Sequence, residues 1–426
     1  MDLSKIKFPE RFQAISRLMV LVVALLFAKV VSARVPPMAA TEAVVPPPAL
    51  PHPHAHPHPY PLPGSSPTWV DSLDDYARNK FLPAKKYNWT WQQSALLRAM
   101  TAQYDQKIGP NPEVYLNYVR TAIDRSMDAA WVGHNPNSVA SGAGLAWLAR
   151  VTGEAKYRSA AESLYQKYLQ IPRFPNGAIW HLRRFAELWD DTIFMVGTYL
   201  LEMYLLTDDE KYLNELLLQV QTHREKLQVT DPNAPGAGLW VHGWDGDDKD
   251  HCRLCSQQHW DENAAHRSTE IWGRGNGWVI VTLTQIVESL PKTHPKWPTF
   301  AGYLKEMLVH LPELQDSATG HWFQLPAYPH VDGNYIESSC TAMFGYGIAG
   351  ALRLGIVEGE AYEAAVDRAY QGLPKHSLSP RGKAWLGTLN VCQGTCIGDQ
   401  EYYFKRKAKA GMAFGVGMVI LFGRAY

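Results

Sequence analysis

Several long segments of this chain are apolar on nearly every helical face, and this pattern restricts the fold more than any other feature. Each is followed, after a short polar turn, by a segment that is apolar on one side only. A helix that is apolar all round must be buried, and an amphipathic helix can cover it. The apolar segments read SGAGLAWLARV, TIFMVGTYLLEMYLL, GWVIVTLTQIV and SCTAMFGYGIAGALRL. The chain therefore predicts helical hairpins, each with one inner and one outer helix.

Helical periodicity dominates from about residue 70 onward, and strand signals are scarce. Inner helices wrapped by outer helices in six hairpins predict an all-α fold, an (α/α)6 barrel. A solenoid of helical hairpins is the alternative, although it would need more regular repeat lengths. We expect helices near residues 92–105, 112–129, 138–151, 155–169, 191–206, 209–225, 275–290, 297–311, 338–354, 358–373, 395–406 and 410–424.

The N-terminal part of the chain predicts two segments ahead of the barrel. A basic leader, an apolar run from Leu18 to Phe27 and the small residues Val31-Ser32-Ala33 are typical of a secretory signal peptide over residues 1–33. We therefore expect a secreted protein, with an uncleaved signal anchor as the alternative. Residues 34–69 are dense in proline and histidine, which predicts an extended linker. The barrel domain is expected over residues 70–426.

Composition narrows the classes of partner. Lys plus Arg and Asp plus Glu both number 41, so nothing in the charge favours nucleic acid or an anionic membrane surface. The 15 Trp and 21 Tyr suit a sugar-binding site, but a large helical core also uses them. Five cysteines fit an oxidising compartment. The segment Asp245–His266 combines Asp, His and Cys, and we interpret it as a polar loop held by a disulfide, with a zinc site as the alternative.

The short motifs that carry chemistry lie just before the all-apolar helices, so we expect them at one end of the inner ring. Asp190 and Asp191 are adjacent, and neighbouring helix positions differ by about 100° in direction. Asp190 lies in line with an apolar stripe, which favours a role in starting the helix. Asp191 lies in line with Met195, on a helical stripe that mixes apolar and polar residues and so suits a solvated lumen. Asp191 is therefore the candidate acid, with helix capping as the alternative.

Other motifs supply further polar groups. His181 directly follows a tryptophan, and His242 stands two residues before one. Arg274 stands between two glycines, four residues before Trp278. Glycines allow the backbone to approach a ligand closely, and arginine is a planar donor suited to a carboxylate. Together with Asp191, these residues predict a site for an acidic sugar.

The motifs WHL…ELWDDTIFM, HGWD, IWGRGNGW, NYIESSCTAM and VCQGT…EYY resemble those of glycoside hydrolase family 105, the unsaturated rhamnogalacturonyl hydrolases. The related family 88 contains unsaturated glucuronyl hydrolases. The resemblance covers residues 70–424 and implies the (α/α)6 barrel of six-hairpin glycosidases. It also implies removal of a terminal 4,5-unsaturated uronic acid from lyase-generated oligosaccharides of the pectin or rhamnogalacturonan type. An aspartate catalyses hydration of the C4=C5 double bond, and no cofactor or metal is expected.

Matched residue by residue, the resemblance implies a set of site residues around one catalytic aspartate, Asp191. Met195 follows it by one turn, and two histidines would contact the substrate. An arginine and a tryptophan would meet the uronate carboxylate and ring, and an N-terminal tryptophan would line the same site. The implied substrate-binding residues are Asn137, His181, Met195, His242, Arg274, Trp278 and Trp89.

Three departures from the family pattern leave other functions open. Asn137 stands where the family usually has a carboxylate, Leu182 replaces a usual lysine, and the cysteine-bearing segment has no counterpart. A non-catalytic carbohydrate-binding barrel is one alternative function. A hydrolase of a saturated glycoside is another, with its second carboxylate supplied by Asp190, Asp245 or Glu337. The sugar next to the uronate and the oligomeric state cannot be read from these motifs.

Overall fold

The computed structural model describes residues 68–109, 111–130, 133–247, 265–379 and 387–426. The predicted signal segment and nearly all of the linker lie outside these residues, as do Cys252 and Cys255 with the disulfide and zinc interpretations placed on them. The three cysteines within them, Cys340, Cys392 and Cys396, form no disulfide. No helix in the described part of the chain has both the length and the apolarity needed to cross a membrane.

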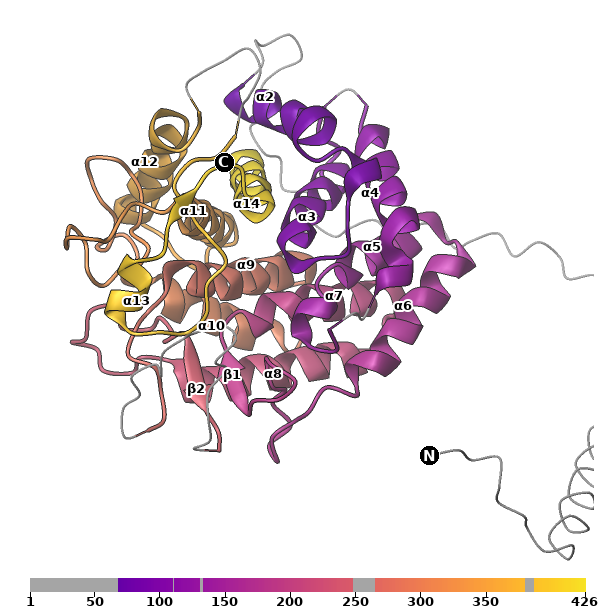
Figure 1. Cartoon of the computed structure of the whole chain (residues 1–426), viewed down its shortest axis with the longest axis horizontal. Coiled ribbons are helices and arrows are strands. Elements are labelled where there is room, and N and C mark those ends of the chain that lie inside the picture. The colour runs from indigo at the N-terminus through magenta and orange to yellow at the C-terminus, as the bar shows by residue number, and fades with distance from the viewer. Residues whose placement is uncertain (1–67, 110, 131–132, 248–264, 380–386) are drawn as a thin grey trace, which may run out of the picture. The chain divides into compact units, whose positions relative to one another are not determined.

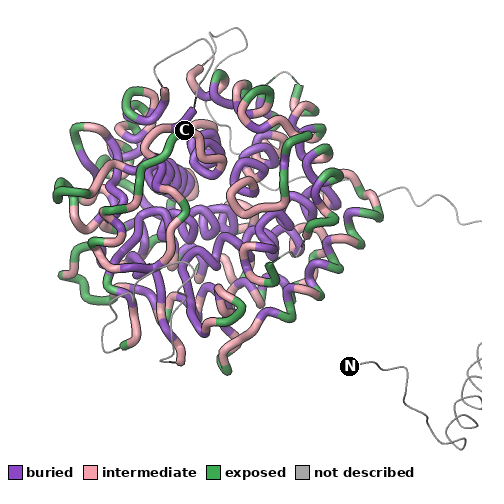
Figure 2. Tube along the Cα trace, in the orientation of Figure 1, coloured by how far each residue is buried: buried purple, intermediate pink, exposed green. Residues whose placement is uncertain are grey.

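Within the described residues, six helices form a closed inner ring (Figure 1). Each packs against the next one along the chain, and the last packs against the first. Most of their residues are buried, as their all-apolar sequences predict (Figure 2). The inner helices are α3 (Trp91–Asp105), α5 (Gly142–Thr152), α7 (Thr192–Thr207), α9 (Gly273–Ser289), α11 (Ser338–Arg353) and α14 (Ala413–Ala425).

Six outer helices in the same residues cover this ring, each packed mainly on one inner helix. They carry exposed residues on one side, which Figure 2 shows along the outside of the ring. They are α2 (Trp69–Tyr76), α4 (Glu113–Ser126), α6 (Ala155–Tyr168), α8 (Glu210–Leu227), α10 (Trp297–Leu308) and α12 (Glu360–His376). The predicted all-α (α/α)6 barrel is confirmed, and the first ten predicted helices are present with bounds within four residues.

The sixth predicted hairpin is wrong. Residues 395–406 contain only the short helix α13 (Gln400–Phe404), between the paired strands β3 (Val391–Cys392) and β4 (Ala408–Lys409). The outer partner of α14 is instead α2, which comes from the other end of the domain. The sequence does carry a signal for α2, because Thr68 and Asp71 form a capping box at its start.

The remaining elements are short and lie in the connections. Strands β1 (Glu187–Trp189) and β2 (Gly243–Asp245) pair in antiparallel register, with Leu188 opposite Trp244. This ladder was not predicted, because three-residue strands carry too little periodicity to be recognised. The single-turn elements are the π-helix η2 (Ala77–Phe81) and the 3-10 helices η3 (Ala84–Lys86), η4 (Met127–Ala129) and η5 (Pro136–Ser138).

The N-termini of the six inner helices meet at one end of the barrel. The N-termini of α3 and α5 meet where Ser141 Oγ donates to the Thr90 carbonyl, and those of α14 and α3 meet where Phe414 stacks on Trp91. Between α9 and α11, Arg274 lies 3.6 Å from Glu337. A helix N-terminus carries a partial positive charge. Six of them around one opening therefore make this end of the barrel attractive to an anion.

We predict that Gly417→Ala lowers the free energy of unfolding by about 1–3 kcal/mol, because overpacking of a core costs this much. A Cβ at position 417 of α14 would lie 2.6 Å from backbone atoms of Ala95 and Leu96 on α3. The matched control is Gly302→Ala in α10, where a Cβ meets nothing within 4 Å. We expect this control to raise stability by about 0.5–1 kcal/mol. Denaturant unfolding measures both, and equal effects would contradict the close approach of α14 to α3.

Candidate active site

The site is built where strand β1 runs directly into helix α7. The Asp190 N–H donates to the His242 carbonyl at 3.1 Å, which holds the end of β1 against the start of β2. The carbonyls of Asp190 and Asp191 then accept from the N–H groups of Ile193 at 3.2 Å and Phe194 at 3.1 Å. The two residues between strand and helix thus form a turn that is hydrogen-bonded on both sides, and this fixes where the two aspartates leave the backbone.

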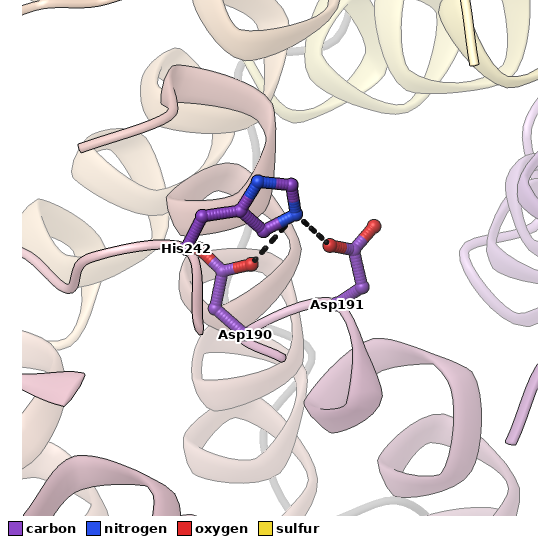
Figure 3. Close-up of side chains that lie close together, drawn as sticks. All are labelled: Asp190, Asp191 and His242. Carbon is purple, nitrogen blue, oxygen red and sulfur yellow. Dashed lines mark hydrogen bonds and ion pairs between the residues drawn. The ribbon is translucent and has the colours of Figure 1, made fainter. Parts of the chain in front are cut away.

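Asp191, His242 and Tyr403 form a hydrogen-bonded row. Nε2 of His242 lies 3.0 Å from Oδ2 of Asp191, and Nδ1 lies 2.6 Å from the Tyr403 hydroxyl. The imidazole is completely buried, whereas 12% of the Asp191 side chain is exposed. Figure 3 shows the other Asp191 oxygen turned away from the imidazole. Asp191 can therefore reach a bound molecule while His242 and Tyr403 hold it from behind.

Two aromatic rings fix the orientation of His242. The Trp272 indole stacks on the imidazole at 4.5 Å between ring centroids, and the Trp189 indole meets it edge-on at 5.4 Å. The Trp189 N–H donates to Glu187 at 2.8 Å, so this indole is itself fixed. The imidazole is contacted by two indole rings and engaged at both nitrogens, which fixes its orientation.

The charge state of Asp191 is set by His242. Burial by itself would raise the pKa of Asp191, but the hydrogen bond from His242 and the electrostatic interactions with His242, His181 and Arg274 hold it below its ordinary value. Asp191 is therefore ionised at neutral pH in the free site.

Asp190 does not cap the helix, and the prediction that it serves the helix start in this way is wrong. The residue at the N-cap position of α7 is Asp191, and it makes no side-chain capping bond. The Asp190 side chain turns into the protein and is 0% exposed. It lies 3.8 Å from Nε2 of His242 (Figure 3). Burial, and then the charge of Asp191, raise the pKa of Asp190 well above its ordinary value.

One group of described side chains has the spacing to hold a metal ion, namely Asp190, Asp191 and His242, whose ligand atoms lie within 4.8 Å of one another. A cation there would have to displace the proton between Asp191 and Nε2 of His242, while Nδ1 stays engaged with Tyr403. The raised pKa of Asp190 also favours a proton in this group. We therefore assign the cluster to proton chemistry.

His181 and His242 both contact Trp189. The His181 ring stacks flat on Trp189, with centroids 4.5 Å apart and planes 7° apart. Nδ1 lies 2.8 Å from the Thr192 hydroxyl, and Nε2 accepts from the Asn137 amide at 3.5 Å. Burial lowers the pKa of His181 to about 4, so the ring is neutral at neutral pH. Asn137 thus contacts His181.

Trp89 lies beside Asn137 at the start of α3. Its indole N–H donates to the Ser138 carbonyl at 2.8 Å, and the ring is half-buried. This bond ties α3 to η5, the single turn that carries Asn137. The structure therefore brings five of the predicted residues to the same end of the ring: Trp89, Asn137, His181, Asp191 and His242.

The structure buries Arg274 among other segments of the chain, so it does not present this side chain for the predicted contact with a substrate carboxylate. The side chain is 0% exposed. Its guanidinium donates to the carbonyls of Cys392 at 2.6 Å and Gln393 at 3.0 Å, and Glu337 lies 3.6 Å away. Helix α9 already begins at Gly273. Arg274 is therefore inside the first turn, where it points at the neighbouring segment.

Trp278 and Met195 are also buried. Trp278 is 0% exposed and packs on Phe194, with ring centroids 4.4 Å apart. Met195 is 1% exposed, on the first turn of α7. Their predicted contact with a sugar is corrected to a place in the barrel core, just below the site. Residues of an inner helix one turn beyond its N-terminus already pack against neighbouring helices, which explains the difference.

Three residues of the site were not predicted individually: Tyr403, Trp272 and Trp189. Tyr403 belongs to the EYY motif, but its role depends on a contact with His242 across 161 positions of sequence. Trp272 and Trp189 stand next to predicted residues, in the motifs IWGRGNGW and ELWDD. Their adjacency to those motifs was the available signal.

The chain was compared with known families and structures. Residues 65–426 match the model of Glycosyl Hydrolase Family 88. The chain is 27% identical over 344 residues to the unsaturated rhamnogalacturonyl hydrolase YesR of Bacillus subtilis, covering 79% of this chain and 89% of that protein. In structure it is similar to a family 105 glycoside hydrolase of C. acetobutylicum, with a TM-score of 0.71 and 21% identity over 84% of this chain and 98% of the other.

A second solved structure, a possible family 105 member from Salmonella enterica, gives a TM-score of 0.70 at 23% identity, over 86% of this chain and 96% of that one. These two likenesses show the fold. The family match covers the whole described barrel, including the segments that carry Asp191 and His242. The predicted membership is thus confirmed: the chain belongs to glycosyl hydrolase family 88, and it is a glycoside hydrolase.

Proposed function

We propose that this hydrolase removes a terminal 4,5-unsaturated uronic acid from oligosaccharides that a polysaccharide lyase has produced, with Asp191 as its acid and base. The observation that carries the proposal is the position of Asp191, whose carboxyl group reaches solvent at the N-terminal end of the inner ring while His242 holds it from behind. One such carboxyl group is sufficient for hydration of a double bond.

The burial of the other candidate carboxylates supports this chemistry over hydrolysis of a saturated glycoside. Displacement at an anomeric carbon requires two carboxyl groups on either side of the bond. The three residues considered for the second role are more deeply buried than Asp191, which is 8% exposed on the same measure, with Asp190 at 0%, Asp245 at 3% and Glu337 at 0%. Glu337 is further occupied as the cap of α11, where it accepts from the Cys340 N–H at 2.6 Å. None of these three residues is thus placed to act as the second carboxyl group beside Asp191.

The electrostatics of the opening support an acidic sugar. Six inner-helix N-termini surround it, and each carries a partial positive charge that favours an anion. A uronate brings one carboxylate. This attraction takes the place of the contact once expected from Arg274, which is buried.

In the proposed reaction, Asp191 donates a proton to C4 of the unsaturated uronate. A water molecule adds at C5 and returns a proton to Asp191, so that the double bond gains one water in total. The resulting hemiketal opens and releases the neighbouring sugar. The bound sugar excludes water, and its carboxylate adds a negative charge. Both effects raise the pKa of Asp191, which favours the protonated form that the first step needs.

The relatives support the substrate class at a coarse level. YesR is described as an unsaturated rhamnogalacturonyl hydrolase. A protein of Alteromonas, 24% identical over 202 residues, is an unsaturated 3S-rhamnoglycuronyl hydrolase. The unsaturated uronyl end is common to these names. We propose pectin or rhamnogalacturonan fragments as the substrate, and secretion as the route by which the protein meets them.

The proposal is tested on a panel of lyase-generated oligosaccharides from pectin, rhamnogalacturonan and glucuronate-containing polymers. We expect the ultraviolet absorbance of the double bond to decay, and a mass gain of one water before the sugars separate. Saturated oligosaccharides of the same composition should remain intact. Binding to the panel without turnover would contradict the proposal and would favour a carbohydrate-binding barrel.

We predict that Asp191→Asn lowers kcat on the best substrate of this panel by about 10²–10⁴-fold, because removal of a general acid costs this much. The amide keeps the shape of the side chain, so the substrate KM should change little. Decay of the ultraviolet absorbance gives both constants. An Asp191→Asn enzyme with the kcat of the native protein would overturn the role of Asp191.

We predict that Tyr403→Phe lowers kcat by about ten-fold with little change in KM, since loss of a partner for a buried polar group costs about 1–3 kcal/mol. The change leaves Nδ1 of His242 without its partner at 2.6 Å. The matched control is Tyr402→Phe, because the Tyr402 hydroxyl bonds to Thr395 and to the Cys396 N–H instead. Equal kinetics for the two variants would contradict the Tyr403–His242 contact.

A further inference from the structure

Asp190 has no part in the reaction as proposed, and its surroundings are unusual for an aspartate. Its backbone is held on both sides, by the His242 carbonyl and by the Ile193 N–H. Its side chain is 0% exposed. Neither oxygen of its carboxyl group has a hydrogen-bond partner among the described residues. A buried ionised carboxylate without donors is very unfavourable, so such a group keeps its proton.

The space for the Asp190 carboxyl group is provided by a glycine. A Cβ at position 275 would lie 2.2 Å from Oδ2 and 2.4 Å from Oδ1 of Asp190. Any residue other than glycine at position 275 would therefore displace the carboxyl group. The second glycine of the motif IWGRGNGW thus serves Asp190, where the sequence suggested a close approach to a ligand.

The groups that face Asp190 come from four elements. Asp191 stands next to it at the start of α7, and His242 precedes β2, with Nε2 3.8 Å from Asp190 Oδ1. From α13 comes Tyr403, whose raised pKa owes part of its shift to Asp190. Behind Gly275 on α9 stands Arg274, which is already occupied by Glu337 and two carbonyls. None of these described groups gives Asp190 a hydrogen bond.

Resting on the function proposed above, we propose that Asp190 is a positioning residue that stores the proton used by Asp191. One nitrogen or oxygen atom from each of Asp190, Asp191 and His242 lies within 4.8 Å of the others in a buried site, and Nε2 of His242 lies within 3.8 Å of both carboxyl groups. Two carboxylates so close do not both ionise readily, so the pair retains one proton. In the free site this proton is on Asp190.

The proton can reach Asp191 through His242 without any net change in the imidazole. The ionised carboxylate of Asp191 can only accept, so Nε2 of a neutral imidazole carries the hydrogen, and Nδ1 is left to accept from the Tyr403 hydroxyl. When a uronate binds beside Asp191, the Nε2 proton passes to Asp191 and the Asp190 proton passes to Nε2. Asp191 then protonates C4, and the water that attacks C5 returns one proton. Asp190 itself never touches the substrate.

The test is the pH dependence of kcat in Asp190→Asn. The amide cannot release a proton, so Asp191 must act with the lowered pKa that His242 imposes. We expect the alkaline limb of the rate profile to move by about one pH unit or more to lower pH, with a loss of about ten-fold or more in kcat at neutral pH and recovery under acid conditions. An unchanged limb, or a uniform loss at every pH, would overturn the proposal.

Two further variants keep the test decisive. Asp190→Leu has nearly the same outline and suits an apolar site, so it replaces Asp190→Asn if the amide prevents folding, with the same expected shift. The matched control is Asp74→Asn, another buried aspartate, at 2% exposure, which bonds to Arg78, Gln103 and Tyr115 on the far side of the domain's core. The control should leave the rate profile in place. A shift in the control equal to that of Asp190→Asn would overturn the proposal.

Infrared spectroscopy separates this proposal from the proposed function. At neutral pH the native protein should show the carbonyl band of a protonated carboxyl group that is missing in Asp190→Asn. Absence of this difference overturns the proton store, whatever the activity. If the band is present but no oligosaccharide of the panel is turned over, the result supports a protonated Asp190 and contradicts only the proposed substrate class. Turnover with an unmoved rate profile would support the substrate and overturn the store.

Discussion

The catalytic end of the barrel depends on one buried cation, Arg274. Its guanidinium binds the carbonyls of Cys392 and Gln393 and lies 3.6 Å from Glu337, with no exposure to solvent. Glu337 in turn accepts from the N–H of Cys392 and caps α11. One charge pair thus joins α9, α11 and the extended segment after residue 390. Removal of one partner from a buried pair costs about 3–5 kcal/mol, because the other charge is left unpaired.

Arg274 affects the position of the catalytic residues through Tyr403. The segment that Arg274 holds leads into α13, and α13 brings the Tyr403 hydroxyl to Nδ1 of His242. His242 then fixes Asp191. The residue expected to hold the substrate therefore holds the scaffold that orients the acid. The roles of the two adjacent aspartates also depend on their surroundings. Asp191 reaches solvent and accepts a hydrogen bond from His242, whereas Asp190 faces Gly275 and has no hydrogen-bond donor.

The sequence predicted most of the fold because burial leaves a local pattern. Helices α7, α9 and α11 are apolar on nearly all faces, and that property needs no knowledge of their neighbours. The role of Arg274 leaves no such pattern, since an arginine between glycines looks the same whether it binds a ligand or two carbonyls 118 and 119 positions away. Asp191, His181 and His242 were located through motifs, whereas the burial of Asp190 and Trp278 follows from contacts between different hairpins.

The packing of α14 on α3 and on α2 ties the two ends of the domain together. Arg424, in the last turn of α14, binds Asp71 in the first turn of α2 and Gln103 on α3. During synthesis on the ribosome, α3 and its neighbours therefore emerge with one flank uncovered until the last thirteen-residue helix is released. Until α14 has emerged, the apolar faces of α2 and α3 that it covers stay exposed, and exposed apolar surface of this kind makes a nascent chain prone to aggregation.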